Sequence, residues 1–260
     1  MDMLYYKGDT CRVFDYALDV HRTMAYHDWI ELNVNGKVVC ELGAGSGIMA
    51  WLCLKYGATK VYCYENNPDT LYHLEELFKD DDRVIIKNED ISTATFPTAD
   101  IYLQENIASN VFMENILGIY ANLKAQGLED KTYPNKIKIQ HGTYTGTSTN
   151  YPFRVENFTN ANVLEFFNKF NMNEIISDVF TYLEHDLSAI NINATVFEGN
   201  LKDLTRITEE DTNNEYIFWE ASFNGKYKFS NWKYKTHWNI IKAGDNHMAI
   251  PEDVTYDINY

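Results

Sequence analysis

The stretch between Val38 and Glu65 constrains the fold of this chain more than any other. A short apolar run ends in Glu41, a glycine turn follows, and a helical pattern then leads to a second β-rich run that ends in Glu65. The turn has glycine at alternate positions: Gly43, Gly45 and Gly47. Glycine lets a backbone take positive φ and pass close beneath a ligand, and the N–H groups at the start of the next helix point to the same place. This pattern predicts the first half of a nucleotide-binding α/β sheet, with Glu65 placed to accept hydrogen bonds from the hydroxyls of a ribose.

The spacing of the glycines narrows the choice of ligand. A dinucleotide-binding turn reads G-x-G-x-x-G, whereas this chain reads G-x-G-x-G with an acid two residues before the first glycine. The pattern resembles motif I of the class I S-adenosylmethionine (SAM) methyltransferases. That resemblance implies SAM as the cofactor and five cofactor-binding residues: Glu41, Gly43, Gly45, Gly47 and Glu65. The alternative is a turn that needs glycine only to bend. The combination of Glu41, the helix after the turn and Glu65 at the expected positions favours a cofactor site.

Composition limits the class of protein and its partners. The chain has 260 residues, 45% of them apolar, which is enough for a sizeable core in one large domain or two small ones. Its formal net charge is −16, so a nucleic-acid backbone would be repelled unless a basic patch overrode the field, and the sequence shows no such patch. We therefore expect no nucleic-acid partner, whereas cationic partners would be attracted. Acidity that serves only solubility is the alternative.

The cysteines and the first residues bear on metals and location. The four cysteines all fall in the first quarter of the chain and include no C-x-x-C pair, so neither a zinc site nor a disulfide framework is suggested. We expect no metal. The first residues carry neither a basic segment nor a long apolar run. We therefore expect an intracellular protein with no signal peptide and no membrane span.

The pattern of apolar residues predicts an α/β fold in three parts. Residues 1–35 form a helical segment, and residues 36–134 form a SAM-binding Rossmann-like domain in which strands and helices alternate. Residues 135–260 are rich in short alternating segments, which predict an antiparallel β-barrel-like domain with a helical arm near 158–178.

Acids follow two of the strands expected in the Rossmann-like part. Val84–Ile86 predicts a third strand, followed by Asp90 and Ile91. Folds of this kind hold an adenine amino group with an acid there and the adenine face with an apolar residue; a charged loop is the alternative. Asp100–Leu103 predicts a fourth strand, and Glu105 follows it at the sheet edge where ligands bind.

Two carboxylates lie nine residues apart in the loop after the fourth predicted strand, Glu105 and Glu114. The pair resembles the double-glutamate loop of the protein arginine methyltransferases, in which two acids clamp a guanidinium. The chemistry suits this interpretation because a guanidinium is a permanently charged planar fork of five donors, which carboxylates can bind in a bidentate manner. A capping role for Glu105 and a helix-start role for Glu114 are the alternatives.

Three further motifs resemble the same family. Thr236-His237-Trp238 matches its Thr-His-Trp loop, Asp19-x-x-Arg22-Thr23 matches its N-terminal pattern, and Tyr133-Pro134 lies where the family often has a cis proline. The resemblance extends from residue 15 to about residue 240 and is specific in these motifs.

The resemblance also implies roles for single residues. Arg22 would hold the SAM carboxylate, Asp19 would hydrogen-bond His237, and Trp238 would line the site. Tyr16 falls at a substrate-gating position where methionine is common. Taken alone, Asp19 and Arg22 would be interpreted as a weak ion pair on a surface helix.

The function implied is SAM-dependent transfer of a methyl group to a guanidinium nitrogen of arginine in a protein or peptide. Glu105, Glu114, His237 and Asp19 would be the catalytic residues. Two features depart from the family: its Tyr-Phe-x-x-Tyr motif cannot be placed, and the barrel is shorter than in typical members. Two alternatives stay open, a class I methyltransferase of a small-molecule amine or of free arginine, and a catalytically silent SAM-binding regulatory partner.

The helical arm near 158–178 carries a stripe of large apolar residues. In the family such an arm docks on a second subunit, which implies a homodimer. A helix folded onto its own barrel is the alternative.

Overall fold

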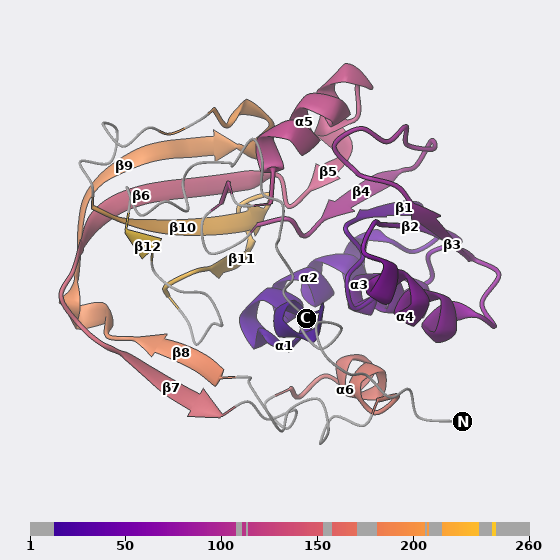
Figure 1. Ribbon diagram of the computed structural model, residues 1–260, viewed down its shortest axis with the longest axis horizontal. Helices are drawn as coiled ribbons and strands as arrows, with labels where there is room; N and C mark the ends of the chain where they lie inside the picture. Colours follow the sequence, from indigo (N-terminus) through magenta and orange to yellow (C-terminus); the bar gives the residue numbers. More distant parts are fainter. Residues whose placement is uncertain are drawn as a thin grey trace, which may run out of the picture.

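The computed structural model describes residues 13–107, 111–112, 114–152, 158–170, 181–205, 207, 215–233 and 241–242. They form a parallel α/β half that contains the glycine turn and an antiparallel β half (Figure 1). Two helices precede the parallel sheet, and the second of them contacts both halves. The expected α/β class, with a Rossmann-like sheet followed by an antiparallel part, is confirmed.

The α/β half contains, in chain order, β1 (Val38–Leu42), α3 (Ile48–Lys55), β2 (Lys60–Glu65), α4 (Pro68–Phe78), β3 (Val84–Asn88), β4 (Ile101–Gln104), α5 (Ile116–Ala125), the short 3-10 helix η2 (Glu129–Lys131) and β5 (Thr132–Tyr133). The five strands are parallel and lie in the order β3-β2-β1-β4-β5. The order reverses between β1 and β4. In open α/β sheets, ligands bind at such a switch point, outside the carboxyl ends of the strands.

Local sequence explains why α4 begins and which face it buries. The side-chain oxygen of Asn67 accepts hydrogen bonds from two first-turn N–H groups at 3.0 and 3.3 Å, and Pro68 follows at a position where its missing N–H costs nothing. Leu71, Leu74 and Phe78 recur at helical spacing and are buried. The helix therefore packs one face against the sheet and presents its N-terminus beside the end of β2.

The N-terminal helices α1 (Val13–Leu18) and α2 (Val20–Asn33) are part of the core. Asp19 caps α2, because its carboxylate accepts the backbone N–H of Arg22 at 3.0 Å. Asp19 is 2% exposed and Arg22 is 1% exposed, so the alternative of an ion pair on a surface helix is wrong. On the same helix, Tyr26 meets Phe223 of the antiparallel half edge-on, and Trp29 stacks on the same ring. Thus α2 joins the two halves of the molecule.

The antiparallel half contains β6 (Lys136–Tyr144), β7 (Ser148–Pro152), β8 (Thr181–His185), β9 (Ile190–Asn200), β10 (Tyr216–Phe223), β11 (Tyr227–Ser230) and β12 (Ile241–Lys242), with the 3-10 turns η4 (Leu187–Ala189) and η5 (Leu201–Asp203). Its main sheet has the order β11-β10-β6-β9, with β12 on β10, and β7 pairs with β8 as a separate ribbon. Among the described strands, β9 and β11 are the two ends of the sheet and do not pair with each other.

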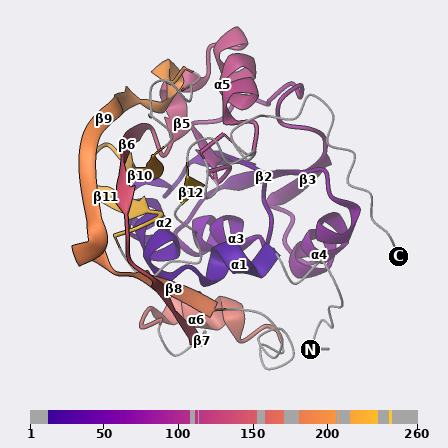
Figure 2. The same cartoon turned by 60° about the vertical axis from the view of Figure 1, so that its left-hand side comes forward.

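The described part of the expected arm is α6 (Ala161–Phe167), which contacts α3 of its own chain. Figure 2 shows α6 at the bottom of the molecule, below α1 and α3. Trp51 of α3 donates its indole N–H to the backbone oxygen of Asn162 at 3.2 Å, and Lys55 pairs with Glu165 at 2.7 Å. In the described residues, the helix therefore docks on the parallel α/β half, whereas the alternative expected it on the barrel. Residues 171–178 lie outside the described residues, and a homodimer through the arm stays a prediction.

The peptide bond between Tyr133 and Pro134 is cis, as the sequence predicts. It lies where the chain leaves β5 of the parallel sheet for β6 of the antiparallel one. Within the part of the chain that the structure describes, no helix is both long and apolar enough to cross a membrane.

Candidate functional site

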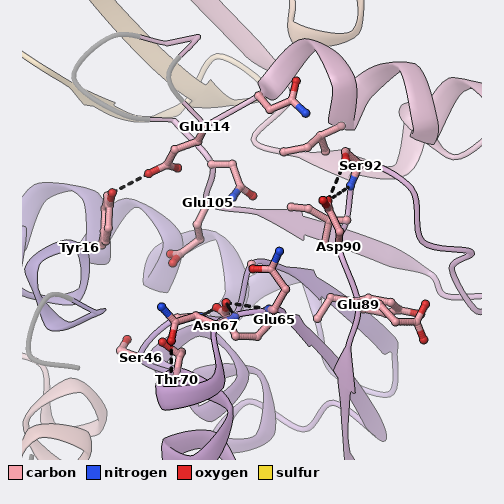
Figure 3. A pocket seen from close by; sticks show the side chains of 18 of the residues that line it. Tyr16, Ser46, Glu65, Asn67, Thr70, Glu89, Asp90, Ser92, Glu105 and Glu114 are labelled. Carbon is pink, nitrogen blue, oxygen red and sulfur yellow. Dashed lines mark hydrogen bonds between the residues drawn. The ribbon is translucent and has the colours of Figure 1, made fainter. Parts of the chain in front are cut away.

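A cavity of about 710 Å³ opens at the switch point of the parallel sheet (Figure 3). Its described lining residues come from α1, α2, the end of β2, the starts of α4 and α5, and the loops after β1, β2, β3 and β4: Tyr16, Arg22, Gly43, Gly45, Ser46, Tyr64, Glu65, Asn66, Asn67, Thr70, Glu89, Asp90, Ile91, Ser92, Glu105, Asn106, Glu114, Asn115 and Ile119. Five carboxylates and one arginine are among them. Its volume is typical of small-molecule sites, and its charge favours a cationic ligand.

The glycine turn after β1 forms one wall of this cavity. Gly45 has φ +49°, and a Cβ placed there would meet no atom within 4 Å, so this glycine faces open space. Gly47 has φ +78°, and a Cβ there would lie only 2.9–3.0 Å from side chains of α4. The two glycines therefore serve different needs, because one leaves room on the cavity side and the other lets α4 pack closely behind the turn.

Glu65 ends β2 and is held in the cavity wall by backbone groups. Its Oε2 accepts the N–H of Gly45 at 3.1 Å, and its Oε1 accepts the N–H groups of Asn66 and Asn67 at 2.9 and 3.0 Å. A carboxylate has about four lone-pair positions, so this one can still accept hydrogen bonds from a ligand.

Asp90 and Ile91 follow β3 and also line the cavity, and Figure 3 shows Asp90 on the side opposite Tyr16. Asp90 Oδ1 accepts both the backbone N–H and the hydroxyl of Ser92 at 2.8 Å. The loop is anchored from α5, since the Asn122 side chain donates to the backbone oxygen of Ile91 at 3.0 Å. Asp90 and Ile91 are thus fixed at the cavity edge.

Glu41 and Gly47 do not line the cavity, although both were expected at the cofactor. Glu41 is 1% exposed, its Oε2 accepts the Cys63 thiol at 3.7 Å, and its Oε1 has no hydrogen-bond partner among the described residues. Burial raises the pKa of Glu41 well above its ordinary value. Their contact with a cofactor therefore stays a prediction from the sequence.

The two glutamates expected to form a pair both line the cavity. Glu105 follows β4, and Glu114 immediately precedes Asn115, the residue before α5. The Tyr16 hydroxyl donates to Glu114 Oε1 at 2.6 Å, as the dashed line in Figure 3 shows. The Arg22 guanidinium donates to the backbone oxygen of Glu105 and lies 3.8 Å from its Oε2. Segments far apart in the chain therefore place two carboxylates at one wall.

Burial dominates the electrostatics of this pair. It raises the pKa of both acids. The charge of Arg22 offsets this only in part for Glu105, and the hydrogen bond from Tyr16 together with Arg22 does so only in part for Glu114. Glu105 Oε1 is buried and has no hydrogen-bond partner among the described residues. A buried carboxylate oxygen without a donor is costly, so a guanidinium that brings N–H groups and positive charge would stabilise the site.

Of the remaining predicted site residues, the structure describes Asp19 but not His237 or Trp238. Asp19 is buried at the start of α2, where it caps the helix. His237 and Trp238 lie outside the described residues, so the contact between Asp19 and His237 stays a prediction. No group of three or more His, Cys, Asp or Glu side chains in the described ranges is arranged to hold a metal ion.

Several cavity residues were not expected from the sequence. Asn67 and Thr70 line the cavity from the first turn of α4, and Asn106 lies against Gly43. Asn67 could have been found, because an Asn before a proline that opens an amphipathic helix is a capping signal directly after Glu65. Asn106 has no such signal, because only the fold brings it to the glycine turn.

The sequence is similar over part of its length to a known enzyme. It is 28% identical over 137 residues to the histone-arginine methyltransferase CARMER of Anopheles gambiae, a match that covers 49% of this chain and 22% of that protein. The chain thus matches only about a fifth of the length of this curated relative. No protein-family model matches the sequence.

Solved structures resemble the chain more completely. The Arabidopsis thaliana protein arginine methyltransferase 10 aligns with a TM-score of 0.55 at 14% identity, over 88% of this chain and 82% of the other. The PRMT1 enzyme–prozyme complex of Trypanosoma brucei, solved with AdoHcy, aligns with a TM-score of 0.52 at 20% identity, over 82% and 69%. The chain has the fold of the protein arginine methyltransferases. PRMT6 shares this fold as well, with a TM-score of 0.55 at 14% identity, over 91% of this chain and 88% of the other.

Proposed function

We propose that this chain is a SAM-dependent methyltransferase that transfers a methyl group to a guanidinium nitrogen of arginine in a protein or peptide. The observation that carries the proposal is the position of Glu105 and Glu114. Both acids are half-buried in the wall of the same cavity that the glycine turn and Glu65 line. The sequence and fold similarity to arginine methyltransferases supports the same reaction.

The residues present fit SAM as the cofactor. Glu65 would accept hydrogen bonds from the ribose hydroxyls, and the open space at Gly45 leaves room for the ligand beside the backbone. Asp90 and Ile91 would hold the adenine at the other end, and Arg22 would bind the carboxylate of the amino-acid part. Bound SAM supplies a methyl group on a sulfonium centre. Glu41 and Gly47 would contribute by holding the turn in shape.

Glu105 and Glu114 would bind the guanidinium of the substrate. Guanidinium N–H donors match carboxylates in a bidentate manner, and one of them would satisfy the buried Glu105 Oε1. The two charges would draw positive charge toward the nitrogen atoms they contact and leave the remaining nitrogen a better nucleophile. Catalysis of this kind depends mainly on positioning and on preorganised electrostatics.

Four other residues complete the proposed site. Asp19 would orient His237, which would take up the proton that the methylated nitrogen loses, and Trp238 would line the substrate side. Tyr16 would limit the space beside the guanidinium, because its hydroxyl is held against Glu114. The assignments of His237 and Trp238 rest on the sequence resemblance.

The proposal extends to partners and location. An arginine-rich protein or peptide suits both the acidic cavity and the net charge of −16. A homodimer through residues 158–178 and an intracellular location belong to the same proposal.

One assay tests the reaction and separates it from its alternatives. Labelled SAM is incubated with the full chain and, in parallel, with an arginine-rich peptide, the same peptide with lysine in place of arginine, free arginine and a small amine. Label in the arginine peptide alone supports the proposal. Label only in free arginine or the amine identifies a small-molecule enzyme, whereas SAM binding without any product identifies a silent regulatory partner. Absence of SAM binding would overturn the proposal.

A further inference from the structure

His73 connects the wall of the cavity to the interior of the protein. It lies in α4 with 0% exposure, and its Nε2 donates to the backbone oxygen of Ser46 at 2.8 Å. Ser46 belongs to the glycine turn and lines the cavity. Burial lowers the pKa of His73 to about 4, so the ring is neutral at pH 7 and carries its single proton on the nitrogen that faces Ser46.

Two phenylalanine rings pack against the His73 ring. Phe14 of α1 meets it edge-on with centroids 5.5 Å apart, and Phe170, just after α6, lies at the same distance. The two phenylalanine rings also contact each other at 5.1 Å. We call Phe14, His73 and Phe170 the aromatic cluster. Its members come from three segments far apart in the chain, and all three are buried.

The position of Phe170 depends on how α6 docks on α3. Phe166 of α6 packs on Phe170 with centroids 5.1 Å apart. The helix itself is tied to α3 by the hydrogen bond between Trp51 and Asn162 and by the ion pair between Lys55 and Glu165. A displacement of α6 would therefore remove one side of the packing that orients His73.

We propose that His73 is a positioning residue that couples the docking of α6 to the shape of the glycine turn, so that α6 controls cofactor affinity from within its own chain. The identity of the cofactor rests on the proposed function, whereas the effect on the turn does not. Histidine suits the position because it combines a flat ring that packs between two phenylalanines with an N–H that reaches a carbonyl oxygen. Phenylalanine would supply only the ring, and glutamine only the donor.

The test uses four single variants of the full chain. His73→Phe removes the N–H that donates to Ser46, and His73→Gln retains an N–H donor. Phe170→Leu removes an aromatic ring that packs against His73. Phe167→Leu is the matched control, because Phe167 is equally buried in the same segment but contacts Phe158 and Phe166. SAM affinity is measured by calorimetry, amide hydrogen exchange is measured over residues 43–48, and thermal unfolding reports stability.

We expect His73→Phe and Phe170→Leu to weaken SAM binding about tenfold and to speed exchange in the glycine turn, because the Ser46 carbonyl loses its donor or the donor loses its orientation. His73→Gln should recover most of the affinity. Phe167→Leu should lower thermal stability while leaving affinity and exchange in the turn unchanged. Equal effects of Phe170→Leu and Phe167→Leu on the turn, or no effect of His73→Phe, would overturn the inference. If the parent chain binds no SAM, the proposed function fails, and the exchange measurements still decide the inference.

Discussion

Glu105 and Glu114 are held in a place that is unfavourable for a carboxylate. Burial raises the pKa of each, and Arg22, with the Tyr16 hydrogen bond at Glu114, offsets this only in part. A folded protein gains nothing from such an arrangement unless the charges have a use, and perturbed carboxylates in a cavity are typical of functional sites. The pair therefore carries the main argument for guanidinium binding.

Replacing either acid by its amide separates charge from shape. We expect Glu105→Gln and Glu114→Gln each to lower kcat by on the order of 100-fold, the scale for loss of a preorganised electrostatic contact. SAM affinity should hardly change, and thermal stability should rise slightly because a costly buried charge is gone. Glu89→Gln is the control, since Glu89 lines the cavity away from the pair. Parent-level activity of both Gln variants on an arginine peptide would show that the pair does not bind the guanidinium.

The raised pKa values also predict a pH dependence. The clamp needs both acids ionised, and a pKa above the ordinary 4.5 of a glutamate means that protons bind at higher pH than usual. We therefore expect kcat/KM, which reports the free enzyme, to fall as pH is lowered before an exposed glutamate would titrate. The profile is measured on an arginine peptide, with circular dichroism at each pH to confirm that the chain stays folded. An acid limb centred at or below about 4.5 contradicts the expectation.

The helix α2 is the element on which the two halves of the molecule meet. Its N-cap Asp19 and its second-turn Tyr26 are buried, and the Tyr26 hydroxyl donates to the backbone oxygen of Gln104 at 2.5 Å, at the end of β4. The same helix packs on β11. A helix in this position can transmit a change in the antiparallel half to the cavity.

The proposed pairing of Asp19 with His237 can be tested without destroying the cap. Asp19→Asn retains a good N-cap, whereas Asp19→Ala loses it at a cost of about 1 kcal/mol in stability. If the two side chains meet, Asp19→Asn and His237→Ala should give non-additive losses of kcat in a double-mutant cycle. Additive losses would mean that the two segments act separately.

In the same activity assay, Arg22→Ala should chiefly raise the SAM concentration that is needed for half-maximal rate.

Charge acts across the whole protein. The chain carries a net charge of −16, and five carboxylates but one arginine are among the described residues that line the cavity. Such a field raises the local concentration of cationic substrates and speeds their encounter.

This steering should weaken with salt. The Debye length falls from about 30 Å at 0.01 M to about 8 Å at 0.15 M ionic strength. We expect kcat/KM on an arginine-rich peptide to drop across this range while kcat changes little, because the encounter is affected and the chemistry is not. A peptide with one arginine among neutral residues is the control and should lose less. Identical salt dependence of the two peptides would argue that the acidity serves solubility alone.

Much of the α/β half could be predicted from the linear sequence because its signals are local. The glycine turn, the acid that ends β2 and the apolar runs of the strands are each encoded within a few neighbouring residues. Parallel strands are covered on both sides, so their apolar runs are continuous and easy to read. The same holds for Glu105 and Glu114, since their position after β4 places them at the ligand edge of the sheet.

Tertiary structure alone decided how distant segments meet. The hydrogen bond from Tyr16 to Glu114, the docking of α6 on α3, and the aromatic cluster each join residues with no local pattern in common. The same is true of Glu41, which has the spacing of a cofactor ligand but is buried behind the turn. Side-chain spacing along a strand or helix sets which face a residue occupies, whereas the packing of elements from elsewhere in the chain sets whether that face is a cavity wall or part of the core.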